Sequence, residues 1–250
     1  MIKKMTLCGL LVCAVVAGAA RPAYAQRPAP AVGRSQDVQF QTFNFLFGGF
    51  FPKGEGSRTE GDVLIANLDP ASPSAFLFDI NGFKGVTFGG EWLLPIGRFI
   101  EFGAGISYSS KTVPSTYLYF SDSDGTEIDS DLRLREVPLA FTARVLPLGS
   151  RSAIQPYVGG GLGVFFWNYS EAGEFIDFSQ DMAIFEDTFE ESGTSTGPIF
   201  LTGARFVHGG FSVGGEFRWH WAEGDLSTDF AGPKIDLGGM TFQATVGARF

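Results

Sequence analysis

Apolar and polar residues alternate without interruption from Met240 to Phe250. Phe242, Val246 and Phe250 fall on the apolar side, whereas Thr, Gln, Gly and Arg residues occupy the positions between them. A period of two over this length predicts a β-strand with one apolar and one polar face. This strand ends on an aromatic residue, Phe250.

The same alternation recurs in seven earlier segments, so that we expect eight strands in total. These earlier segments cover approximately Val38–Phe51, Gly82–Ile96, Phe99–Ser110, Asp131–Leu146, Ala153–Asn168, Gly197–Val207 and Phe211–Trp221. In the fourth segment, Leu132 and Leu134 share one phase but Leu139 and Phe141 share the other. A change of phase within a strand indicates an inserted residue, and we therefore expect a β-bulge near Glu136.

Phenylalanine and glycine dominate the two faces of these strands. The chain contains 27 Phe and 34 Gly residues. Phe43, Phe45 and Phe47 share one face of the first strand, and Thr42 and Asn44 share the other. An aromatic face opposite a face of small and polar residues suits a wall that contacts lipid outside and encloses a crowded lumen.

The connections between the strands alternate between long and short. Tight turns follow the second, fourth and sixth strands, and the long connections are polar. These long segments are Pro52–Asn81, Lys111–Ser130, Tyr169–Thr196 and Ala222–Asp236. Short turns on one side and long loops on the other are typical of outer-membrane barrels. We therefore predict an all-β fold, an eight-stranded antiparallel up-and-down transmembrane β-barrel over residues 38–250, rather than a secreted β-sandwich.

The first 25 residues have the features of a cleaved secretory signal. Lys3 and Lys4 precede a short apolar run, and Ala23-Tyr24-Ala25 provides a cleavage site. The run is too short for a comfortable transmembrane helix, which argues against an uncleaved anchor. Residues 26–37 are expected to form a flexible lead. Both cysteines lie inside the signal, and we expect an exported chain without disulfides, located in the bacterial outer membrane.

Three motifs carry a resemblance to a known family. Pro-Tyr-Val-Gly-Gly-Gly-Leu-Gly occupies positions 156–163, Glu-Phe-Arg-Trp occupies positions 216–219, and the last strand ends on Phe250. Together they resemble the small OmpA-like outer-membrane β-barrel domain family over residues 38–250. The resemblance implies that Phe242, Val246 and Phe250 form an assembly signal for the barrel-assembly machinery. Members of the family include anchors, adhesins, small pores and a few lipid-modifying enzymes.

Charged residues fall on the face that we expect to line the lumen. They are Glu91, Glu101, Arg144, Arg205, Glu216, Arg218 and Arg249. An eight-stranded barrel is only just wide enough to be filled by side chains. Opposite charges at these positions are expected to pair and to plug the interior, and a narrow or gated pore is the alternative.

The sequence offers little for catalysis or metal binding. Its two histidines, His208 and His220, are predicted to lie at opposite ends of a strand pair, which argues against a shared metal site. We expect no catalytic site, cofactor or metal. The acidic stretch Asp122–Glu127 lacks the spacing of a known calcium loop. A net charge of −9 argues against a nucleic-acid partner.

These observations predict a structural or surface-interaction role without catalysis, and a small channel for minor solutes is the alternative. The expected partners are outer-membrane lipid, lipopolysaccharide and the barrel-assembly machinery. The acidic long loops could hold an extracellular ligand, could bridge divalent cations to lipid head groups, or could only keep the surface solvated.

Overall fold

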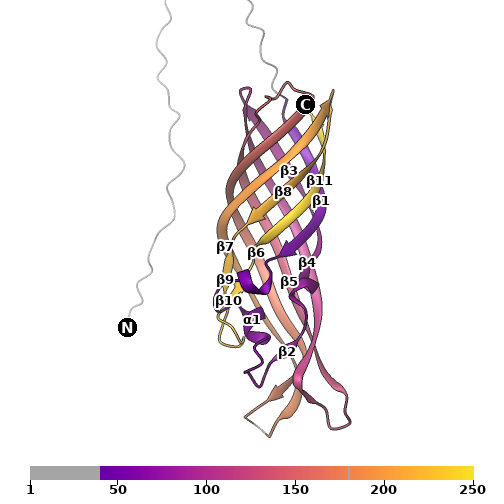
Figure 1. Ribbon diagram of the computed structural model, residues 1–250, viewed down its shortest axis with the longest axis vertical. Coiled ribbons are helices and arrows are strands. Elements are labelled where there is room, and N and C mark those ends of the chain that lie inside the picture. Colours follow the sequence, from indigo (N-terminus) through magenta and orange to yellow (C-terminus); the bar gives the residue numbers. More distant parts are fainter. Residues whose placement is uncertain (1–39, 180) are drawn as a thin grey trace, which may run out of the picture. The chain divides into compact units, whose positions relative to one another are not determined.

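The computed structural model describes residues 40–179 and 181–250. The predicted signal (1–25) and lead (26–37) lie outside the described residues. Eight long antiparallel strands form the described part (Figure 1). They are β1 (Thr42–Pro52), β3 (Gly85–Ile96), β4 (Ile100–Ser121), β5 (Glu127–Val145), β6 (Ile154–Asp177), β7 (Ala183–His208), β8 (Phe211–His220) and β11 (Gly239–Arg249).

The eight strands close into a barrel. Each strand pairs with the next long strand along the chain, and β11 pairs with β1, with Phe45 opposite Val246. The first and last strands are also joined by backbone hydrogen bonds in both directions between Gln41 and Phe250. Because the sheet closes, every long strand has a partner on both sides. The predicted eight-stranded up-and-down barrel is therefore confirmed.

Three short turns lie at one end of the barrel, which we call the near end. They contain Gly97, Gly149 and Gly209, whose φ angles of +73°, +75° and +56° favour glycine. Phe250 lies at the same end (Figure 1). The turns therefore occupy the positions that the sequence predicted, after the second, fourth and sixth long strands.

Two of the predicted long loops are wrong. Segments 111–130 and 169–196 consist mostly of strand, because β4, β5, β6 and β7 continue well past the other strands. Short tips join them, and one is a tight turn in which Gly125 has a φ of +87°. Their polar composition misled the prediction, since most of the polar residues lie on the outer face while Val113 and Phe175 are buried.

The other two connections contain small elements that cover the extended strands. Between β1 and β3 lie η1 (Glu55–Ser57), α1 (Val63–Asn67), β2 (Phe76–Leu77) and η2 (Ile80–Phe83), and between β8 and β11 lie β9 (Glu223–Asp225) and β10 (Lys234–Asp236). Buried polar contacts fasten them together: Asp62 binds Arg58 at 2.5 Å and accepts from the backbone amide of Asp236 at 2.7 Å. No helix among the described residues is long and apolar enough to span a membrane.

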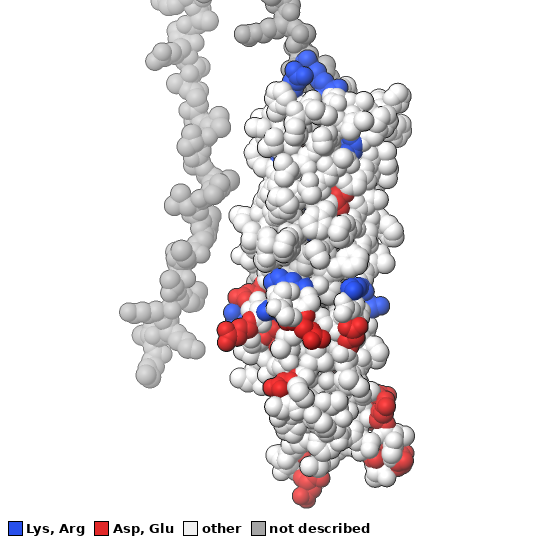
Figure 2. All heavy atoms as spheres, in the orientation of Figure 1, with Lys and Arg blue, Asp and Glu red and all other residues white. Residues whose placement is uncertain are grey.

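The barrel has two parts with opposite polarity. In the belt half, which comprises β1, β3, β8, β11 and the parts of β4–β7 beside them, apolar side chains point outward. Phe45, Leu162 and Val246 are 68%, 65% and 56% exposed there. In the far half, which comprises residues 109–136 and 167–196 with the small elements, apolar side chains such as Leu132 and Tyr169 point inward and are fully buried. Figure 2 shows the belt as a band almost free of charge, with charged residues concentrated on the far half.

The expected bulge near Glu136 is absent. Ile106 lies opposite Leu139 and Ser109 lies opposite Glu136, so the β4–β5 register continues without a shift through this point. A register irregularity occurs further along, between Thr116 and Ser121. The apparent change of phase arises because the apolar residues of β5 move from the inner face, at Leu132, to the outer face, at Phe141.

Candidate functional site

Six of the seven predicted lumen charges meet inside the belt half. Glu91 lies on β3, Glu101 on β4, Arg144 on β5, Arg205 on β7, and Glu216 and Arg218 on β8; all are at most 7% exposed. Alternation along the strands turns each of them inward, between lipid-facing apolar neighbours. Five separate strands therefore supply one buried charged cluster, which we call the lumen network.

Arg144 lies at the centre of the lumen network. One of its terminal nitrogens, Nη2, lies 2.5 and 2.6 Å from the two carboxylate oxygens of Glu91 and 2.9 Å from Oε2 of Glu216. The guanidinium also stacks over the ring of Tyr157, with its carbon 4.8 Å from the ring centroid. One cation is thus shared by two carboxylates and an aromatic face, a dense arrangement that charge-assisted hydrogen bonds favour.

Arg218 closes the same group from β8. It donates to Glu216 through Nε and lies 2.7 Å from Glu91 Oε1 through Nη2. Uncharged donors complete the coordination of Glu216: the Tyr157 hydroxyl donates to Oε2 at 2.9 Å and the Gln243 amide donates to Oε1 at 3.0 Å. Both oxygens of this buried carboxylate are therefore satisfied by several donors, as a buried charge requires.

A second pair lies nearer to the short turns. Arg205 binds Glu101 through two parallel contacts of 3.0 and 2.6 Å, and its Nε donates to the side chain of Gln155 at 2.9 Å. Arg144 Nη1 approaches Glu101 Oε1 at 3.9 Å and links this pair to the central group. The lumen network therefore contains three arginines and three glutamates, which balance in charge.

Arg249 stands apart from the lumen network. It is half-buried at the near end, 5.2 Å above the ring of Phe40, and makes no ion pair within the described residues. It lines a cavity of about 450 Å³ that opens at the short turns, together with Arg98, Glu101 and Arg205. The network lies at the bottom of this cavity, so a solute entering from the near end meets paired charges.

Glycines on the inner face make room for the large side chains. A Cβ on Gly203 would lie 2.6 Å from the Tyr157 hydroxyl oxygen, and one on Gly103 would lie 2.7 Å from Thr142 Oγ1. Both distances are shorter than side chains tolerate. The glycines on the inner face thus leave the space that the inward Arg, Glu and Tyr side chains occupy, and these side chains fill the narrow lumen.

Uncharged members of the network were missed by the sequence prediction. Gln155 and Gln243 are buried and bind Arg205 and Glu216, respectively. Tyr157 is buried as well and donates to Glu216. All three residues lie at inward positions of the strand alternation, and this position was the one feature of the sequence that could have identified them. The register between strands determines which charged group a neutral side chain contacts. Alternation alone does not give this register.

The two histidines lie apart, as predicted. His208 is exposed beside the near-end turn after β7, and His220 is buried at the end of β8. His220 stacks between Phe50 and Phe165, at ring-centroid distances of 5.8 and 4.9 Å, and its Nε2 contacts the carbonyl oxygen of Leu237 at 3.0 Å. Within residues 40–179 and 181–250, no group of three or more His, Cys, Asp or Glu side chains is arranged to hold a metal.

Two residues of the predicted assembly signal lie on the outer face of β11, and the third, Phe250, directly follows that strand. Phe242, Val246 and Phe250 are 53%, 56% and 62% exposed. Phe242 packs against Phe217 at a ring-centroid distance of 4.9 Å. They form one continuous lipid-facing row beside β1 and β8, and their recognition by assembly machinery stays a prediction.

Comparisons with known proteins fall into two groups. No family model and no curated protein matches the chain. Solved structures do resemble it. The outer membrane protein OprG from Pseudomonas aeruginosa has a TM-score of 0.47 at 13% identity, over 85% of this chain and 96% of that chain. Ail of Yersinia pestis has a TM-score of 0.40 at 12% identity, over 85% of this chain and 99% of that chain.

Neisserial surface protein A has a TM-score of 0.40 at 14% identity, over 84% of this chain and 95% of that chain. The closed sheet, its apolar outer belt and its polar lumen are the features that decide the fold class of the described chain. The fold is a transmembrane β-barrel. Its belt half spans the lipid, and its far half extends beyond the lipid on one side.

Proposed function

We propose that this barrel is closed to solutes and works at the cell surface of a bacterium, in the outer membrane, through its far half. The observation that carries the proposal is the lumen network. Three arginines and three glutamates cross the lumen with direct contacts between opposite charges. A plug of this kind fits a structural or surface-interaction role and does not fit a route for solutes.

The energetics of the network support closure. Breaking a buried ion pair by removing one partner costs about 3–5 kcal/mol, because an uncompensated charge remains in a low-dielectric interior. A passing solute would have to separate several such pairs at once. The eight-stranded wall leaves little room for these side chains to move aside. They already pack closely against the glycines of the inner face.

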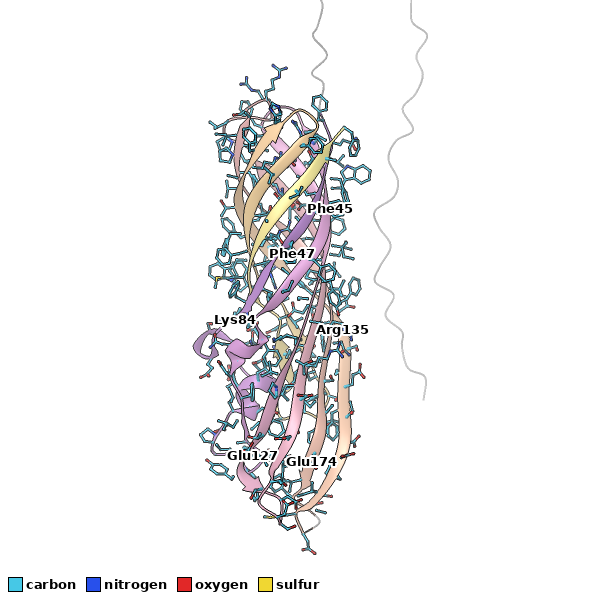
Figure 3. The ribbon with its side chains drawn as sticks, turned by 90° about the vertical axis from the view of Figure 1, so that its right-hand side faces the viewer. Phe45, Phe47, Lys84, Glu127, Arg135 and Glu174 are labelled. Carbon is cyan, nitrogen blue, oxygen red and sulfur yellow. The ribbon has the colours of Figure 1, made fainter. Side chains whose placement is uncertain are left out.

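The orientation follows from the connections. Outer-membrane barrels place short turns in the periplasm and long connections outside the cell. We therefore orient the near end toward the periplasm and the far half toward the medium. Glu127 and Glu174 lie near the far tip (Figure 3), and exposed Asp129 and Asp131 extend the same acidic face. A partner at this surface would carry positive charge, either as a basic protein segment or as a polycation.

Bilayer conductance tests the closed lumen. We expect purified wild-type protein to show no single-channel events in planar bilayers. Glu216→Ala should unbalance the network and give events or leak, whereas Asp129→Ala on the outside of the far half should stay silent. Regular wild-type events with a conductance that Glu216→Ala changes would contradict closure and favour the small channel.

The small channel has one observation in its favour. The cavity of about 450 Å³ at the near end penetrates to Glu101 and Arg205. If the barrel conducted, its narrowest point would lie just beyond this cavity, at Arg144. The wild type should then conduct, and charge reversal at Glu101 should change its ion selectivity in the same bilayer recordings; the plugged lumen does not allow conduction by the wild type.

Binding of a polycation tests the surface role. Immobilised polylysine should retain the folded wild-type protein at low salt and release it as salt rises, because exposed charges are screened. A variant with Glu127→Gln, Asp129→Asn and Asp131→Asn should bind less, and Arg98→Ala at the other end should bind as the wild type does. Equal retention of all three would show that the acidic surface serves solvation alone.

We propose no catalytic role. Hydrolases of the serine type need a histidine within hydrogen-bond reach of a nucleophilic side chain. The buried His220 is enclosed by two phenylalanine rings and a backbone carbonyl, and its nearest carboxylate oxygen, on Glu136, lies 4.0 Å away. Acyl release from phospholipid or lipopolysaccharide that disappears in His220→Ala would contradict this assignment.

A further inference from the structure

The barrel wall changes at the outer edge of the belt, where β3 reaches less far than β4. Pairing between β1 and β3 ends where Phe50 lies opposite Gly85, and pairing between β3 and β4 ends where Thr87 lies opposite Ser109. Beyond these points β4 continues while β3 stops. At this step the outer surface holds a cavity of about 550 Å³, which we call the edge cavity.

The edge cavity is divided into an apolar part and a basic part. Phe51, Val86, Phe88 and Tyr108 form its apolar lining, and the rings of Phe88 and Tyr108 lie 5.4 Å apart. Lys84 and Lys111 lie at its rim, and both are exposed. Neither lysine side chain makes an ion pair or hydrogen bond within the described residues.

Arg135 adds a third cation next to this rim. It lies opposite Ser110 in the β4–β5 ladder, and Ser110 lines the edge cavity. The Nε atom of Arg135 is buried and has no hydrogen-bond partner within the described residues. The Arg135 side chain makes no hydrogen bond or ion pair within the described residues, so its guanidinium has donors to offer an anion beside this rim. Lys84 and Arg135 lie at the same level along the barrel (Figure 3).

The position of the cavity identifies the kind of ligand. Its apolar lining continues the belt, where acyl chains surround the barrel, and its cations lie where head groups begin. A ligand that satisfies both parts is an anion with hydrocarbon chains. Phosphate matches guanidinium and ammonium donors, and a free phosphate would leave the aromatic lining without a contact.

We propose that the edge cavity binds a phosphate-bearing, acylated membrane lipid, with its phosphate on Lys84, Lys111 and Arg135 and an acyl chain along Phe88 and Val86. The assignment rests on the belt spanning lipid and not on closure of the lumen. Lipid would then order the outer edge of the barrel where β3 stops.

One carboxylate lies close to this site and defines its inner limit. Glu136 lines a narrow crevice of about 10 Å³ that shares Gly85, Ser110 and Lys111 with the edge cavity. This crevice has room for about one water molecule at most, so a phosphate group cannot enter it. The lipid phosphate therefore stays on the outer face, away from the Glu136 side chain.

Native mass spectrometry of the folded full-length protein in detergent tests the proposal. The probes are a bis-phosphorylated acylated glucosamine disaccharide, the same lipid without its phosphates, and inorganic phosphate. We expect the phosphorylated lipid to bind to the wild type. It should bind about 10- to 30-fold more weakly to the Lys84→Ala/Lys111→Ala variant, because two exposed cations that attract the anionic head group are removed. Arg98→Ala, at the opposite end, is the matched control and should bind as the wild type does.

Each result has a defined meaning. Heat-modifiable migration verifies folding, and Lys84→Gln/Lys111→Gln replaces the alanine pair if that pair misfolds. Equal binding of the phosphorylated and dephosphorylated lipids, or equal binding by the wild type and the lysine variants, would overturn the proposal. Displacement of the lipid by equimolar inorganic phosphate would also overturn it, because the acyl contacts would then contribute nothing. Conductance recordings on the same samples keep failure here separate from failure of the closed lumen.

Discussion

The belt half and the far half use the same strands with opposite polarity. On β5, Asp131 points outward and Leu132 is buried inside, whereas ten residues later Phe141 is 52% exposed outside and Arg144 is buried inside. The backbone alternation does not change between these points, and the register with β4 is continuous. The difference shows that the surrounding solvent determines which face is apolar.

The physical reason is the same in both halves. Apolar side chains leave water wherever they can, either inside the far half or against lipid in the belt half. In the far half this gives an ordinary buried core, with Ile128, Leu132 and Tyr169 at most 1% exposed. In the belt half lipid contacts most of the apolar side chains, and the interior holds ions that must satisfy one another beside a few buried residues such as Leu93 and Leu201.

Removal of the central cation should have the largest effect on the belt half. Arg144→Met would remove one of the two arginines that contact both Glu91 and Glu216 and leave Arg218 alone between them, and we expect a loss of about 3–5 kcal/mol in the free energy of unfolding. Urea titration of the folded barrel in detergent micelles measures this loss. Arg144→Met/Glu91→Gln should recover part of the loss, and a single variant as stable as the wild type would show that the network contributes no net stability.

A core truncation should have a comparable but smaller effect on the far half. Leu132→Ala removes a fully buried side chain, and the cavity that remains should cost about 2–5 kcal/mol. Leu162→Ala changes the same residue type on the outer face of the belt half, where detergent or lipid fills the space, and should cost clearly less. Equal losses in the same urea titration would mean that the far half lacks a tightly packed interior.

A charge on the outer face should distinguish the two halves directly. Phe141→Arg places a cation on the lipid face and should cost about 2–4 kcal/mol if Phe141 lies near the bilayer midplane. Asp131→Arg, on the same face of β5, should stay within about 0.5 kcal/mol because water surrounds it. Folding yield into lipid vesicles and denaturant midpoints measure both. A large cost at Asp131 would place the membrane boundary further along the strand than we infer.

The sequence predicted the belt half well because a strand with one lipid-facing side shows a regular alternation of apolar and polar residues. The eight strands, the three short turns and the inward Glu216 and Arg144 all follow from period two. The far half was misread as loops, since Glu, Asp, Ser and Thr on an outer face resemble loop composition. The inversion at Leu134 and Glu136 was the available signal, and it was taken for a bulge.

The pairing within the site could not be predicted from the sequence. Alternation shows that Arg205 and Glu101 point inward, but they lie on β7 and β4, which face each other across the lumen without being neighbours in the sheet. Contacts across the lumen depend on the tilt and stagger of the closed barrel. The edge cavity likewise depends on where β3 stops relative to β4.

The smallest expected effect concerns one ionisable group in the interior of the far half. Glu171 is buried beyond the belt, where its Oε1 accepts from Asn67 of α1 at 2.7 Å and from the Tyr169 hydroxyl at 2.8 Å. Burial raises the pKa of its carboxyl above the ordinary value, while these two hydrogen bonds lower it. The folded state therefore binds this proton more tightly than the unfolded state does.

The contribution of Glu171 to stability should consequently be complete below its unfolded pKa and decline as the pH rises toward its higher folded pKa. Glu171→Gln keeps an acceptor for both donors without the charge, so we expect this variant to match the wild type in acid and to exceed it modestly near neutral pH. Denaturant midpoints of both proteins from about pH 4 to about pH 8 measure the difference. Parallel curves would mean that water reaches Glu171, and that the interior of the far half is less dry than its buried leucines and tyrosines indicate.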